Sequence, residues 1–224
     1  MYFLKKLLDI LFPASEVETK LIAMCDKGNV PRALPVPHNN IFAAANYHDA
    51  VIRASIRVLK TRRNTPIAQR FARLVHEHIA ALLQDKEPFT TYEKIIIVPI
   101  PITKNRLRER GFNQTILIAN ELIKFDEKYS LENILTKTLE TKKQAVSISK
   151  AKRKENIKGC FECKNKNENK QQGEKHSSRE RPGPKSTLYV VLDDVVTTGA
   201  TINEAMVTLG HAKYKPVIGI AVAH

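Results

Sequence analysis

The chain has 224 residues, a formal net charge of +14 and a hydrophobic content of 42%. This length is enough for one core of ordinary size, and the composition excludes a chain too polar to fold. It contains no apolar run long enough to span a membrane and only three cysteines, so we expect a globular α/β protein of the cytoplasm, not an integral membrane protein.

The first forty residues combine an amphipathic pattern with a proline-rich linker. Residues 1–12 place two lysines within an apolar run, and no convincing signal-cleavage site follows. They are predicted to form a helix that docks on the domain or on a partner, with membrane contact as the less favoured alternative. Because residues 31–37 contain three prolines, they are predicted to be extended. We therefore place a helical N-terminal extension at residues 1–40 and the main domain at residues 41–224.

Strand and helix patterns alternate through the main domain. Strands are predicted at residues 41–47, 95–101, 134–139 and 216–222, and helices at residues 49–60, 66–83 and 113–125. A basic loop at residues 103–110 joins the second strand to the third helix. This alternation favours a parallel sheet with helical crossovers.

Residues 189–201 are the most informative segment of the chain. Residues 189–192 read as a buried central strand, and Asp193 and Asp194 are predicted to mark its carboxyl end, where open α/β sheets bind ligands. The turn at residues 197–201 (Thr-Thr-Gly-Ala-Thr) precedes a helix predicted at residues 202–209, so its N–H groups and hydroxyls suit an anion. This combination predicts a sugar-phosphate site; helix capping alone is the less favoured alternative.

The segment resembles the phosphoribosyl pyrophosphate signature of the type I phosphoribosyltransferases. The resemblance implies an α/β fold with a parallel sheet flanked by helices. It also implies that Asp193 and Asp194 contact the ribose hydroxyls and hold Mg²⁺, directly or through water. The residues implied to wrap the 5′-phosphate are Thr197, Thr198, Gly199, Ala200 and Thr201.

A second set of charged residues follows the strand at residues 95–101. Arg106 and Arg110 are predicted to neutralise a leaving pyrophosphate, because guanidinium groups bind phosphate oxygens bidentately. The loop that begins at Pro99 is predicted to add backbone N–H contacts, and residues 140–158 to form a lid. The candidate catalytic residues are therefore Asp193, Asp194, Arg106 and Arg110. The alternative for the arginines is a solvated basic turn.

Arg110-Gly111-Phe112-Asn113-Gln114, together with the strand that ends in prolines, resembles the ComF family, competence-associated proteins built on the phosphoribosyltransferase domain. Tyr47, Ile56 and Leu59-Lys60 resemble a helix of that family, and the similarity spans residues 41–224. The family's usual four-cysteine zinc module has no counterpart, since the first forty residues contain only Cys25. Residues 162–186 are predicted to be a mobile insertion.

Three functions remain open at this point. The chain could transfer a phosphoribosyl group to an acceptor base, sense phosphoribosyl pyrophosphate without turnover, or bind single-stranded DNA during uptake. Residues 142–185 contain 14 Lys and Arg against 5 Glu, which suits nucleic acid and a solvated insertion equally. The resemblance also makes competence or helicase proteins candidate partners and leaves a homodimer open.

Overall fold

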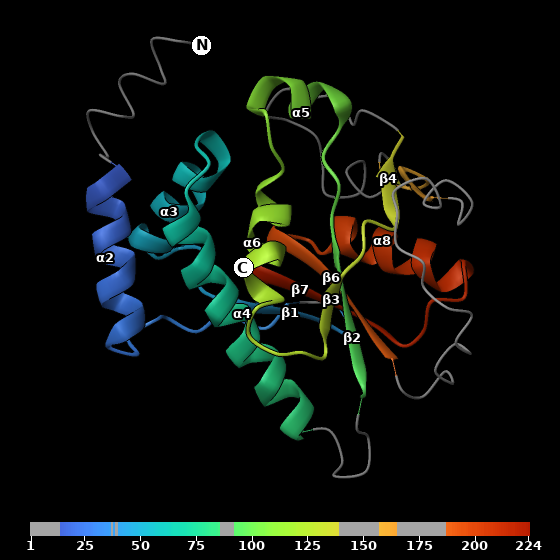
Figure 1. Cartoon of the computed structure of the whole chain (residues 1–224), viewed down its shortest axis with the longest axis horizontal. Coiled ribbons are helices and arrows are strands. Elements are labelled where there is room, and N and C mark those ends of the chain that lie inside the picture. Colours follow the sequence, from blue (N-terminus) through green and yellow to red (C-terminus); the bar gives the residue numbers. More distant parts are fainter. Residues whose placement is uncertain (1–13, 37, 39, 86–91, 139–156, 165–186) are drawn as a thin grey trace.

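The computed structural model describes residues 14–36, 38, 40–85, 92–138, 157–164 and 187–224. Its centre is a five-stranded parallel sheet in the order β1-β7-β6-β2-β3 (Figure 1). The strands are β1 (Ile41–Ala45), β2 (Lys94–Pro99), β3 (Tyr129–Leu131), β6 (Thr187–Val195) and β7 (Val217–Ala223). The predicted parallel α/β sheet is confirmed.

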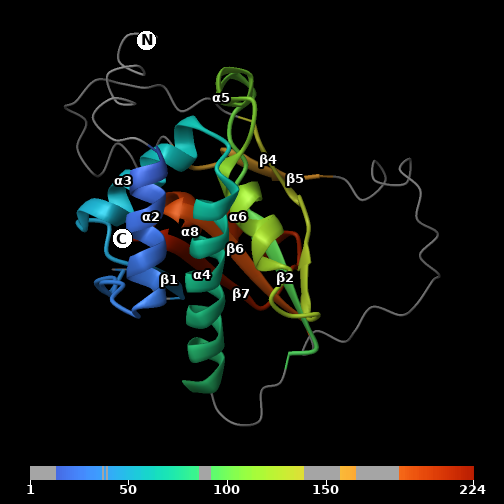
Figure 2. The same ribbon diagram turned by 60° about the vertical axis from the view of Figure 1, so that its left-hand side comes forward.

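Four helices form the layer on one face of the sheet: α2 (Ala14–Asp26), α3 (Ala50–Thr61), α4 (Thr65–Asp85) and α6 (Gln114–Leu122). Leu188, Val190 and Leu192 of β6 point into the core beneath them. Figure 2 shows α2 on the outside of this layer, where it packs against α3 and α4. Val17 and Leu21 of α2 belong to the same core, so α2 is stabilised by apolar burial.

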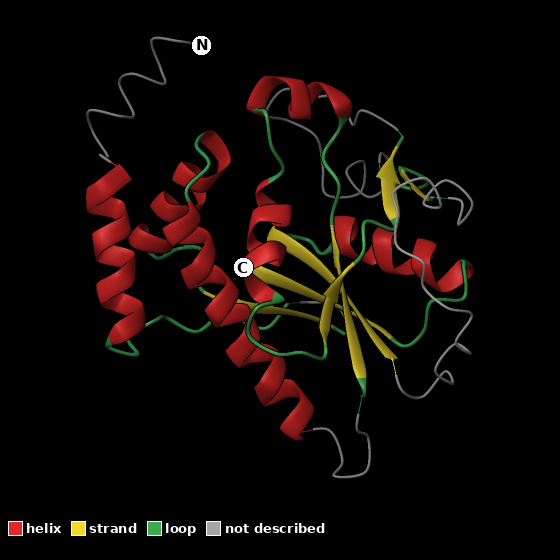
Figure 3. Cartoon of the chain, viewed as in Figure 1, coloured by secondary structure: helices red, strands yellow, loops and turns green. Residues whose placement is uncertain are grey.

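The opposite face carries α8 (Ala200–His211) and a small antiparallel sheet of β4 (Leu135–Lys137) and β5 (Phe161–Cys163) (Figure 3). Val191 of β6 points into this second core. Because β6 buries alternate residues on opposite faces, nearly every one of its positions is apolar until the two aspartates.

Several predicted elements lie where the sequence patterns place them. The helix predicted at residues 49–60 is α3, whose first turn is capped by the Asp49 side chain, which accepts hydrogen bonds from the N–H groups of Val51 and Ile52. The helices predicted at residues 66–83, 113–125 and 202–209 are α4, α6 and α8. The strands predicted at residues 41–47, 95–101 and 216–222 are β1, β2 and β7.

The prediction of a basic loop at residues 103–110 is wrong. The structure has a helix there, α5 (Lys104–Arg110), which begins after the capping residue Thr103 and ends at Gly111 with φ of 79°. None of its residues is buried, and it stands beyond the carboxyl end of β2 (Figure 1). The sequence has good helix formers but no apolar stripe, and the prediction relied on that stripe.

The strand predicted at residues 134–139 is β4, which is shorter than predicted and is not part of the main sheet. β4 pairs antiparallel with β5 outside the main sheet, while β3, which was not predicted, forms the edge of that sheet beside β2. Both strands have three residues, and so short a run shows little periodicity. Which of them joins the sheet is decided by the partner strand.

Some predicted segments lie outside the described residues. These are the helix at residues 1–12, most of the lid at residues 140–158, and residues 165–186 of the insertion. Glu162 and Cys163, at the start of that insertion, belong to β5. Among the helices that the structure describes, none is long and apolar enough to cross a membrane.

A substitution at Gly219 tests the packing of β7 against α8. A Cβ atom there would clash with Cγ2 of Ile202, so we expect Gly219→Ala to lower the free energy of unfolding by about 1–3 kcal/mol. The matched control is Gly210→Ala, where the nearest atom to a Cβ is Lys215 Cε at 3.6 Å. Urea unfolding of both variants measures the difference, and equal stabilities would contradict the packing argument.

Candidate functional site

The direction in which successive strands are added to the sheet reverses between β2 and β6. The chain leaving β2 passes through α6 on one face to the neighbouring strand β3, and the chain leaving β6 passes through α8 on the other face to its other neighbour, β7. The loops after β2 and β6 therefore separate and leave a crevice at the carboxyl ends of the strands. Crevices of this kind are where open α/β sheets bind ligands.

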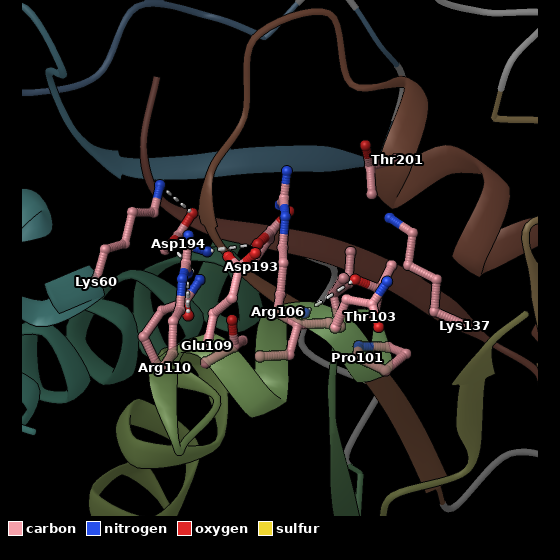
Figure 4. Close-up of a pocket in the computed structure, with 15 residues that line it drawn as sticks. Lys60, Pro101, Thr103, Arg106, Glu109, Arg110, Lys137, Asp193, Asp194 and Thr201 are labelled. Atoms are coloured by element: carbon pink, nitrogen blue, oxygen red, sulfur yellow. Dashed lines mark hydrogen bonds and ion pairs between the residues drawn. The ribbon is translucent and has the colours of Figure 1, made fainter. Parts of the chain in front are cut away.

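A cavity of about 690 Å³ occupies this crevice. Residues after β2, the two aspartates of β6 and Thr201 of α8 line its wall. Its charged lining residues are Lys60, Arg106, Arg110, Lys137, Glu109, Asp193 and Asp194. Figure 4 shows that these side chains come from different elements and converge on one space, which suits an anionic ligand with bound cations.

Asp194 is held by side chains from two helices. Its Oδ1 lies 3.1 Å from Nζ of Lys60 on α3, and its Oδ2 accepts a hydrogen bond of 2.7 Å from Nε2 of Gln114 on α6. The amide oxygen of Gln114, Oε1, accepts a hydrogen bond of 2.9 Å from Nη1 of Arg110. Because both carboxylate oxygens are engaged and the residue is only 6% exposed, Asp194 has one fixed orientation.

The segment Arg110-Gly111-Phe112-Asn113-Gln114 builds this arrangement. Gly111 adopts the left-handed conformation that ends α5, and Asn113 caps α6 through a hydrogen bond from the N–H of Thr115. The Asn113 side chain also donates to the Ile100 carbonyl at 3.0 Å, which ties α6 to the end of β2. These residues position Arg110 and Gln114.

Asp193 differs from its neighbour in its contacts. Among the described residues its side chain has one hydrogen-bond partner, the N–H of Asp194 at 2.8 Å. Burial, and then repulsion from Asp194, raise the pKa of Asp193 to about 7. The pair therefore divides into a fixed carboxylate, Asp194, and one that has oxygen lone pairs left for a ligand, Asp193.

The turn after β6 is fixed by contacts from other segments. Two features favour glycine at position 199. Its φ of 73° lies in the left-handed region, and a Cβ atom there would lie 2.5 Å from Cδ2 of His38. His224 Nε2 lies 3.2 Å from the carbonyl oxygen of Thr197. The N-cap residue of α8, Gly199, has no side chain to cap the first N–H groups, and N–H groups at a helix start suit an anion.

The predicted site residues divide into two groups. Asp193, Asp194, Arg106, Arg110 and Thr201 all line the cavity. Pro99, Thr197, Thr198, Gly199 and Ala200 are not among its lining residues. Asp193 and Asp194 mark the carboxyl end of the strand, as predicted, although β6 continues for one more residue to Val195.

Sequence reasoning assigned no role to Lys60, Gln114 and Lys137, although all three line the cavity. Lys60 and Gln114 lie in segments that resemble the ComF family, and that resemblance was the one signal in the sequence that could have indicated a role for them. Lys137 is at the end of β4, and nothing in its sequence context distinguishes it from other surface lysines. Its position depends on the pairing of β4 with β5.

The carboxylate pair fits Mg²⁺ in its chemistry. Mg²⁺ prefers oxygen ligands and usually retains waters or substrate oxygens, so one or two protein carboxylates are enough. The described residues contain no cluster of three or more His, Cys, Asp or Glu side chains that could hold a metal ion. A cation at this pair would have coordination positions left for water and other oxygen ligands.

The architecture indicates the class of protein. A parallel sheet with helices on both faces and charged residues at the carboxyl ends of its central strands is consistent with a phosphoribosyltransferase-like fold.

A curated relative narrows this class. The chain is 31% identical over 108 residues to Competence protein F of Haemophilus influenzae, which supports a relationship to the ComF family. The aligned region covers 48% of this chain and only 41% of that relative's length. No protein-family model matches the chain.

Replacing Gln114 tests how Asp194 is held. In Gln114→Leu, the Asp194 Oδ2 and Arg110 Nη1 groups lose their common partner, so we expect a loss of about 1–3 kcal/mol in the free energy of unfolding. Chemical denaturation measures it, with Gln84→Leu at the end of α4 as the control. Equal stability of the two variants would show that the hydrogen bonds of Gln114 do not contribute to the free energy of unfolding.

Proposed function

We propose that the chain binds phosphoribosyl pyrophosphate together with Mg²⁺ in the cavity between β2 and β6. The observation that carries the proposal is the convergence of three kinds of group in one space. Carboxylates at the end of β6 suit ribose hydroxyls and a cation, Thr201 in the first turn of α8 suits the 5′-phosphate, and Arg106, Arg110 and Lys137 suit the pyrophosphate.

The chemistry of transfer, if an acceptor base is present, would use the same residues. Loss of pyrophosphate from C1 of the ribose leaves a positively charged, oxocarbenium-like centre, as in glycosidic cleavage. Arg106 and Arg110 would stabilise the negative charge on the departing pyrophosphate. A bound Mg²⁺ would neutralise more of that charge, and the carboxylates of Asp193 and Asp194 would hold the ion. Transfer also requires an acceptor base, so binding of phosphoribosyl pyrophosphate is tested before transfer.

Titration calorimetry with Mg²⁺ and phosphoribosyl pyrophosphate tests binding. We expect saturable binding by the wild-type protein and none by the Asp193→Ala/Asp194→Ala double variant. Absence of binding by a folded wild-type protein would reject the proposal. Release of pyrophosphate in the presence of a panel of nitrogenous bases then separates an enzyme from a sensor that binds without turnover.

Single-stranded DNA is the second candidate ligand. The supporting observations are the basic composition of residues 142–185 and the curated relative named Competence protein F. Most of that tract lies outside the described residues, so the proposal depends on charge and not on geometry. Deleting residues 165–185 should weaken DNA binding and reduce its dependence on salt concentration. Unchanged affinity and salt dependence would show that the tract does not contribute to DNA binding.

A further inference from the structure

The ion pair between Lys60 and Asp194 is unequal in its exposure to solvent. The Lys60 side chain is 32% exposed, whereas the Asp194 side chain is 8% exposed. Lys60 comes from the last turn of α3, on a flexible stem of four methylene groups. The ammonium group can therefore withdraw toward water, while the carboxylate cannot follow it.

The other contact of Asp194 is held more firmly. Gln114 is only 5% exposed, and its amide is bonded at both ends, to Asp194 and to Arg110. A ligand that needs an oxygen of Asp194 meets less resistance at Oδ1, where Lys60 lies, than at Oδ2. Lys60 also lines the cavity, so its displaced ammonium group would remain near an anionic ligand.

We propose that Lys60 is an exchangeable internal cation of this site. It neutralises Asp194 in the ligand-free protein, and its ammonium group leaves Oδ1 when a divalent cation binds at the carboxylate pair. The inference rests on the proposed function in one respect, because it takes Asp193 and Asp194 as the cation site.

Electrostatics gives the direction of the effect. A buried carboxylate without a partner is costly, so Lys60 stabilises the protein when no ligand is bound. The same positive charge repels a divalent cation only a few ångströms away, and the cation must displace it before it can use Oδ1. Lys60 therefore lowers the affinity of the site for a free divalent cation.

The test is calorimetric titration with Mg²⁺ alone at about pH 8, where Asp193 is mostly ionised. We expect Lys60→Met to bind Mg²⁺ about tenfold more tightly than the wild type, and Lys60→Arg to bind it about as the wild type does. Lys20→Met is the matched control, because Lys20 pairs with Glu16 on the exposed surface of α2. Equal or weaker binding by Lys60→Met, or no binding by either protein, overturns the proposal.

A measurement on the wild-type protein decides the question if Lys60→Met does not fold. The ¹⁵N resonance of the Lys60 ammonium should shift as Mg²⁺ is added, and that of Lys20 should not. An unchanged Lys60 resonance at saturating Mg²⁺ would show that the ion pair persists and would overturn the proposal. Failure of the proposed function looks different: wild-type protein that binds Mg²⁺ but not phosphoribosyl pyrophosphate would reject the ligand while leaving the exchange of Lys60 intact.

Discussion

Replacing Asp193 with asparagine is expected to weaken binding of Mg²⁺ and phosphoribosyl pyrophosphate by about 100-fold or more, while the protein stays folded. The substitution keeps the shape of the side chain and an oxygen that can accept the hydrogen bond from the N–H of Asp194. It removes the charge that a cation requires, and losing one partner of a buried charge pair costs about 2–5 kcal/mol in binding.

The control for this variant is Asp126→Asn, which changes a half-buried carboxylate outside the cavity whose Oδ1 accepts a hydrogen bond from the N–H of Lys128. Calorimetry gives the affinities, and circular dichroism verifies the fold. Affinity within about threefold of the wild type in Asp193→Asn would mean that the less constrained carboxylate is not the principal ligand.

The second large effect is a dependence of stability on pH that comes from Asp193. In the folded protein its pKa is raised to about 7 from an ordinary value of 3.8. The folded state therefore keeps a proton that the unfolded chain releases. The resulting stabilisation is complete below the ordinary pKa and is lost as the pH rises through about 7.

Urea unfolding of wild type and Asp193→Asn between about pH 5 and pH 7 measures this loss. We expect the wild-type free energy of unfolding to fall by about 2 kcal/mol relative to the variant across that range. The comparison cancels the contributions of other titrating groups. Parallel pH curves for the two proteins would mean that Asp193 titrates normally.

Both expectations follow from a carboxylate pair that lowers the stability of the protein when both groups are ionised. Two adjacent carboxylates at the end of a buried strand repel each other, and Lys60 and Gln114 compensate only one of them. A bound cation would relieve the remaining repulsion. The ligand and the stability of the apo protein are therefore linked through Asp193.

The sequence determined the class of fold and predicted the carboxylates of the candidate site. Buried strands such as residues 189–192 are continuous apolar runs, and amphipathic helices such as α4 have apolar periodicity, so the local sequence reveals both. Aspartates at the end of a buried strand are rare enough to mark a candidate ligand site from the sequence alone.

The tertiary structure decided what periodicity does not encode. Whether β3 or β4 joins the main sheet depends on a partner strand far along the chain, and α5 has no buried face to reveal it. Asp193 and Asp194 look alike in the sequence. Only packing brings Lys60 and Gln114 to one of them and leaves the other with oxygen lone pairs available, because contacts between residues distant in sequence are set by the fold and not by the local pattern.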